Sequence, residues 1–94
     1  MNIRRARLDV DWAIAGPGIE AVAAAIDGVE GVAAGTVTIT EIDLETVGTD
    51  VVVEGEGFEL KALIAAIEES GAVVHSIDQL AFGDRIAEHV ARSR

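Results

Sequence analysis

The sequence predicts an α+β fold with six elements in the order βαββαβ. Its apolar residues switch between strict alternation, typical of strands, and recurrence at every third or fourth position, typical of helices. Breakers that contain glycine separate these segments. A chain of 94 residues has room for one compact domain, so we predict a single domain over residues 1–94 in which residues 83–94 are a tail or a short helix.

The first two elements are a strand and a helix. Residues 3–12 alternate apolar and charged side chains, which predicts a strand that is buried on one side. Gly16-Pro17-Gly18 ends this strand, and Pro17 suits the start of a helix. Apolar residues then recur at helical spacing, which predicts a helix over residues 17–27.

The middle of the chain predicts a β-hairpin. Val37 and Ile39 alternate with threonines, which indicates a second strand that continues to Asp43. Residues 44–48 provide a turn, and the valine-rich residues 49–54 form the return strand. We therefore expect the second and third strands to pair with each other.

A second helix and a fourth strand follow. Residues 55–57 (GEG) are expected to break the chain before a helix over residues 58–70. Residues 72–82 are rich in β-branched side chains and predict the fourth strand. The tail offers little beyond Ile86 and Val90 for packing, so it is either a short helix docked on a neighbour or a frayed end.

This order predicts a ferredoxin-like sandwich. Right-handed crossovers place both helices on one face of a four-stranded antiparallel sheet with strand order 4-1-3-2. The other face is left uncovered, and it carries the threonines of the second strand. This uncovered face is also expected to carry four side chains of the first strand, Arg5, Arg7, Asp9 and Asp11. Such a face suits solvent and is also a natural surface for self-assembly.

The composition excludes several function classes. The chain has 17 acidic and 7 basic residues, a formal charge of −10, which disfavours nucleic acid and membrane partners because both need Lys and Arg to displace counterions. Without cysteine there are no disulfides and no thiolate metal sites. An acidic surface with Lys61 as its only lysine indicates a halophilic source, where salt screens the self-repulsion. The alternative is an ordinary acidic protein.

The location expected from the sequence is cytoplasmic. No apolar run approaches the roughly 18 to 20 residues that a membrane-spanning helix needs. The first residues lead into a strand pattern and not into the apolar block of a signal peptide.

Five stretches of the chain, taken in order, carry a resemblance. They are Arg4–Asp9 (RRARLD), Val29–Val32 (VEGV), Glu41–Thr46 (EIDLET), Val51–Gly55 (VVVEG) and Gly71–Asp78 (GAVVHSID), followed by Gly83. Together they resemble a family of small, mostly archaeal proteins, domain of unknown function 211 (DUF211), over about residues 3–88. The resemblance implies a ferredoxin-like fold and ring-like or larger homo-oligomers, and it implies no established activity.

One loop departs from the family pattern. Members usually follow the first strand with a Lys-Pro-His-Glu-Pro-like loop, whereas residues 11–17 (DWAIAGP) keep only the last proline. Any role of that histidine and glutamate does not carry over. The same fold houses amino-acid-sensing ACT domains and soft-metal chaperones, and Gly31-Val32 resembles their helix-to-strand corner. The Cys-x-x-Cys of the chaperones is absent.

Carboxylates at the end of the second strand are candidate metal ligands. Glu41 and Asp43 occupy alternate positions and should project to one side, and oxygen ligands of this kind suit Ca²⁺ or Mg²⁺. The alternative is a solvated strand end in a protein that is acidic everywhere. In a ring, carboxylates repeated at subunit junctions would complete a cation site that one subunit lacks.

His75 is the other candidate. The fourth strand is expected beside the first, which brings His75 near Asp9 or Asp11. A histidine with carboxylates binds a transition metal or titrates near neutral pH, and the alternative is a structural pair with one carboxylate. His89 is assigned no role. No nucleophile elbow or phosphate-binding loop is present, so we predict no enzyme and no certain cofactor.

Two functions from different classes follow. The first is a homo-oligomeric binding or regulatory module that takes a small ligand or a divalent cation at subunit interfaces. The second is a structural or adaptor oligomer that presents surfaces to a partner protein. Both assume self-association, because the apolar fourth strand lies at a sheet edge and such edges are usually paired or covered. Edge pairing or exchange of the tail through Ile86 and Val90 would cover it.

Overall fold

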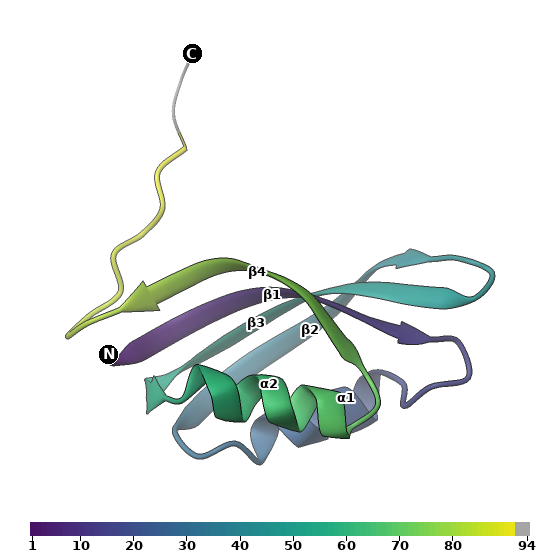
Figure 1. The fold of residues 1–94 in the computed structure, drawn as a ribbon. Helices are drawn as coiled ribbons and strands as arrows, with labels where there is room; N and C mark the ends of the chain where they lie inside the picture. Colours follow the sequence, from purple (N-terminus) through teal and green to yellow (C-terminus); the bar gives the residue numbers. More distant parts are fainter. Residues whose placement is uncertain (92–94) are drawn as a thin grey trace.

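The computed structural model describes residues 1–91 and has its elements in the order βαββαβ (Figure 1). The strands are β1 (Ile3–Ala13), β2 (Val32–Ile42), β3 (Thr46–Phe58) and β4 (Val73–Phe82), and the helices are α1 (Ile19–Asp27) and α2 (Leu60–Glu69). The sheet is antiparallel with order β2-β3-β1-β4, and both helices lie on one of its faces. The predicted ferredoxin-like α+β fold is confirmed.

The core lies between the helices and the two central strands. Alternate residues of β1 and β3 point toward the helices, and the side chains they bury there are mostly small and branched. Each helix adds one buried stripe to this layer. The fully buried members include Leu8, Val10, Val51 and Val53 from the sheet, Val22 from α1, and Leu63 and Ile67 from α2.

Several boundaries differ from those predicted. The return strand is longer than residues 49–54, because β3 begins at Thr46 and runs to Phe58. The predicted breaker, residues 55–57, is accommodated as an irregularity within the strand: Ile3 of β1 pairs with Phe58, and two residues later Arg5 pairs with Glu54. The helices begin two residues later than predicted, at Ile19 and Leu60.

Glycines allow the corner between α1 and β2 to pack directly on this irregular part of β3. Gly31 has φ +91°, and a Cβ on it would collide with the carbonyl oxygen of Gly57. A Cβ on Gly55 would in turn collide with the carbonyl oxygen of Gly31. The Glu56 N–H donates to that same oxygen at 3.3 Å. The backbone at Gly31 therefore packs directly against the backbone at Gly55 and Gly57, and only glycine fits at Gly31 and Gly55.

The tail bends over residues 83–85, and residues 83–91 contain no helix. It leaves the end of β4 on the side of the sheet away from the helices (Figure 1). The Gly83 carbonyl oxygen accepts hydrogen bonds from Asn2 Nδ2 at 3.2 Å and from Arg4 Nε at 2.9 Å. Of the two alternatives for the tail, the short helix is wrong for these residues; the rest of the predicted tail, residues 92–94, lies outside the described residues.

We expect Gly31→Ala to destabilise the fold by about 2 to 4 kcal/mol, because it combines a positive φ with a backbone collision. Gly18→Ala is the matched control, since Gly18 also has a positive φ, +83°, but has nothing within 4 Å of its Cβ position. It should cost only about 1 to 2 kcal/mol, because only the unfavourable backbone conformation, φ +83° and ψ 168°, opposes the side chain. Urea unfolding of both variants measures the difference, and equal losses would contradict the importance of the close approach.

Candidate functional site

The open face of the sheet carries most of the charged side chains that strands contribute. Arg5, Arg7, Asp9 and Asp11 of β1 alternate with the buried residues of that strand and therefore lie on this face, as the alternation predicts. Along β1 the face changes character. Its first half holds ion pairs with arginine, and its second half holds carboxylates.

The arginines are engaged by carboxylates. Arg7 makes a bidentate pair with Asp50, at 3.0 Å from Nε and 2.8 Å from Nη2. Arg5 Nε donates to Glu54 at 2.8 Å, and its Nη atoms lie 3.3 Å from Glu88 in the tail. The hydrogen bonds to Glu88 and Glu54 raise the pKa of Arg5, and the hydrogen bonds to Asp50 raise the pKa of Arg7. These arginines hold part of the tail and are not free to bind an anion.

A row of residues crosses the other half of the open face. Asp11 of β1 pairs with Gly48 of β3, and Gly48 pairs with Glu41 of β2. His75 of β4 adds its Nδ1 at 3.6 Å from Asp11 Oδ2. The sheet therefore brings three of the five candidate ligands, Asp11, Glu41 and His75, onto one row, which we call the Gly48 row.

The glycine leaves space in the middle of this row. At the position of a Gly48 Cβ, Asp11 Oδ1 would be 3.6 Å away, the Glu41 Cβ 3.7 Å away and Thr40 Oγ1 3.8 Å away. Oxygen atoms from β1 and β2 thus flank an open position above a bare backbone. Oxygen donors of this kind suit hard cations such as Ca²⁺ and Mg²⁺.

The other two candidates do not join the row. Asp9 lies two residues along β1, where it pairs with Asp50 and Ser76. Asp43 follows the end of β2, and its Oδ1 accepts a hydrogen bond from the Leu44 N–H at 2.7 Å, so it stabilises the hairpin turn. Within residues 1–91 no three His, Asp or Glu side chains are close enough to hold a metal ion between them.

Sequence reasoning overlooked Gly48 and Thr40. The available signal was a glycine inside a valine- and threonine-rich segment, because such a glycine often marks a place where something approaches the backbone closely. It was read instead as part of a turn. Knowing that it separates Asp11 from Glu41 requires the register of three strands, which periodicity does not supply.

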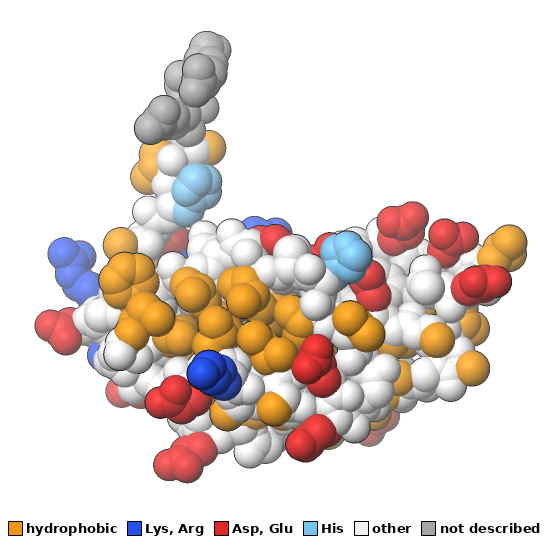
Figure 2. Space-filling model, in the orientation of Figure 1, with side chains coloured by type: hydrophobic (Ala, Val, Ile, Leu, Met, Phe, Trp, Pro, Cys, Tyr) orange, Lys and Arg blue, Asp and Glu red, His pale blue; other side chains and the backbone are white. Residues whose placement is uncertain are grey.

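A second surface feature is an apolar band on the side where β4 and α2 meet (Figure 2). The β4 members pair with buried β1 residues, so they face the helix layer, but they lie at the sheet edge and stay partly exposed. Phe82 is 61% and Ile77 43% exposed. The band consists of Leu60 and Ile64 from α2 with Val74, Ile77, Leu80 and Phe82 from β4.

The fold and these surfaces define a ferredoxin-like α+β protein with an open, charged sheet face and an apolar edge. The chain belongs to the DUF211 family, described as uncharacterised ArCR, whose match covers residues 4–94. It is similar to the uncharacterised protein MJ0319 of Methanocaldococcus jannaschii, with 37% identity over 65 residues. That match covers 69% of this chain and 61% of the relative, so the chain spans less than two thirds of the relative's length. No helix within residues 1–91 has the length and apolar character to cross a membrane.

Proposed function

We propose that the protein works as a homo-oligomeric binding or regulatory module in a salt-rich cytoplasm, assembled through the apolar band. The observation that carries the proposal is the exposure of large apolar side chains in one contiguous region of an otherwise strongly acidic molecule. Contiguous apolar surface of this kind marks interaction sites. A second copy of the same band is a suitable partner, because a two-fold axis brings the same apolar surface of both subunits together.

The form of β4 supports side-chain packing over strand pairing at this edge. Its pairing with β1 shifts register three times, and two of these shifts leave His75 and Asp78 as extra residues on β4. Such bulges interrupt the regular hydrogen-bonding edge that an added strand needs. We therefore assign the contact at β4 to the band, with α2 packing against the partner subunit.

Ile77→Asp should convert the assembly into monomers, because it buries a carboxylate in the apolar contact. Leu44→Asp is the matched control: it makes the same chemical change at the hairpin tip, where Leu44 is 94% exposed and outside the band. Sedimentation velocity in molar KCl reads out both variants. A wild-type chain that sediments as a monomer would overturn the proposal.

The ligand that we propose for this module is a divalent cation held at the Gly48 row. The flanking oxygens of Asp11 and Thr40 support this choice, and the side chains of Glu41 and His75 lie beside them. One subunit supplies too few converging donors, so carboxylates of a neighbouring subunit would complete the coordination shell. The site would then be occupied only in the assembly, which links cation binding to oligomerisation.

Gly48→Ala tests the cation site with little damage to the fold, since its Cβ would make only ordinary contacts of 3.6 to 3.8 Å. We expect the methyl group to fill the open position and weaken Ca²⁺ binding at least tenfold in calorimetric titration, and Glu41→Gln to do the same. Glu68→Gln, an exposed charge change on α2, is the control and should bind as the wild type does. A wild-type oligomer that binds no Ca²⁺ or Mg²⁺ would eliminate the cation.

An adaptor that presents surfaces to a partner protein is the second candidate, and the end of the β2–β3 hairpin favours it. This end extends beyond the helices (Figure 1), and it exposes Ile42 and Leu44, 67% and 94% respectively. Apolar side chains at a projecting tip suit insertion into another protein. An oligomer that contains no metal and keeps its mass after treatment with a chelator would favour the adaptor function over the cation-binding module.

A further inference from the structure

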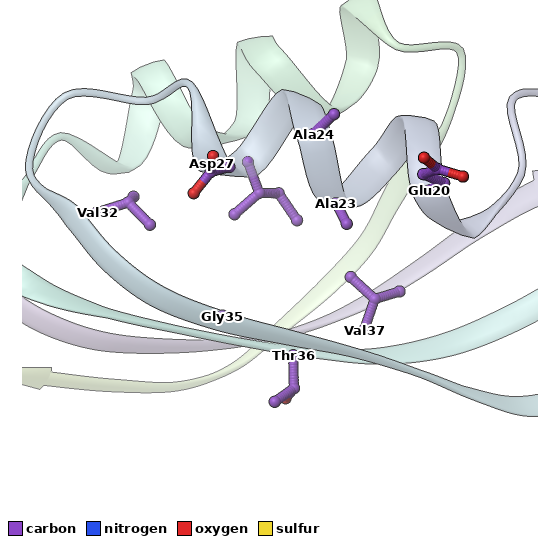
Figure 3. A pocket seen from close by; sticks show the side chains of 9 residues that line it. Glu20, Ala23, Ala24, Asp27, Val32, Gly35, Thr36 and Val37 are labelled. Carbon is purple, nitrogen blue, oxygen red and sulfur yellow. The ribbon is translucent and has the colours of Figure 1, made fainter.

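The edge of the sheet opposite the apolar band carries a groove between α1 and β2. It has a volume of about 390 Å³. Val32 and Val37 point into it from β2, Ala23 points back from α1, and Thr36 points away to the open face (Figure 3). The groove is therefore apolar inside.

The rim of this groove is acidic. Glu20 and Asp27 stand near opposite ends of α1, and both are exposed. Seven residues of helix separate their Cα atoms by about 10 Å along the axis. An occupant that combines apolar side chains with positive charge would match both the interior and the rim.

The β2 strand that borders the groove is a suitable template for an added strand. It lies at the sheet edge, and residues 32–40 include no charged side chain and no proline. Its pairing with β3 is regular from Ala34 to Ile39, without the bulges found in β4. An edge of this kind accepts an extended segment through backbone hydrogen bonds.

The chain itself contains a segment with the required chemistry. Residues 85–94 hold three of its seven basic residues, Arg85, Arg92 and Arg94, and one acidic residue. Residues 1–84 hold four basic residues and sixteen acidic ones. The tail also carries Ile86 and Val90, and Val90 is 83% exposed. It is a basic, partly apolar segment attached to an acidic domain.

We infer that the groove between α1 and β2 binds the C-terminal tail, residues 84–94, of a second copy of this chain as an added strand. Ile86 and Val90 supply the apolar contacts, and the arginines meet Glu20 and Asp27. A second copy is favoured over the same chain because the tail leaves the sheet on the side away from the helices, whereas the groove lies on the helix side (Figure 1). The inference rests on the proposed homo-oligomer and identifies a second contact between its subunits.

A spin label tests which chain fills the groove. Because the sequence has no cysteine, Ser93→Cys gives a single labelling position in the tail of the full-length chain. The spin-labelled chain contains nitrogen of natural abundance. It is mixed with a second chain that is enriched in ¹⁵N and carries no spin label. We expect paramagnetic broadening of the Ala23, Gly35 and Val37 amides of the ¹⁵N copy. Leu44→Cys, at the hairpin tip, is the control label and should leave these amides sharp.

Charge reversal tests the chemistry of the contact. Arg92→Glu with Arg94→Glu should raise the dissociation constant of the tail-mediated contact roughly tenfold at 0.15 M salt and abolish the broadening. Glu20→Arg with Asp27→Arg should do the same, and combining both pairs should restore binding. The matched control is Glu45→Arg with Glu69→Arg, two exposed acids outside the groove and the apolar band, which should change neither readout.

The outcomes separate this inference from the proposed function. An assembly that persists without broadening at the groove would overturn the inference and leave the homo-oligomer standing. Broadening in dilute monomers that carry both the spin label and ¹⁵N would show that the tail binds the groove of its own chain, and this result would also overturn the inference. A chain that is monomeric at every concentration would overturn both.

Discussion

The helices of this domain are much shorter than the strands that they cover. Helices of 9 and 10 residues extend about 14 to 15 Å, whereas strands of 10 to 13 residues extend roughly 33 to 43 Å. Two such helices bury the middle of one sheet face and leave the opposite face, the outer strands and the far end of the β2–β3 hairpin uncovered. The apolar band and the projecting hairpin result from this mismatch, whereas the charged face is open because both helices lie on the other face.

The two outer strands, β2 and β4, are both exposed at a sheet edge but differ in regularity and in the side chains that they expose. β4 is interrupted by bulges and exposes apolar side chains, which favours packing against another surface. β2 is regular and uncharged over most of its length, which favours backbone pairing. A homo-oligomer that used both would have two distinct contacts for each subunit, and two distinct contacts are sufficient to build a closed assembly larger than a dimer.

Periodicity was sufficient to predict the order of the elements and the layer that each side chain joins, because both depend on residues close in sequence. Periodicity was insufficient where contacts with segments far away in the sequence determine the local structure. Residues 55–57 have the composition of a breaker, yet they continue β3, where Gly31 packs closely against them. The candidate ligands show the same limit. The strand order was sufficient to predict His75 beside Asp11, but the row through Gly48 depends on strand register. Asp43 belongs to the hairpin turn, which the sequence predicted to begin one residue later.

The position of β1 at the centre of the sheet has a consequence for how the chain folds. Both of its neighbours, β3 and β4, follow it in sequence, and the contact between Asn2 and Gly83 joins residues 81 positions apart. Hairpin β2–β3 involves only adjacent segments, so its loop-closure entropy is smaller and it is favoured to form early. Within this sheet β1 is thus enclosed only when β4 is in place, and until then the folding chain exposes its most buried strand to other chains.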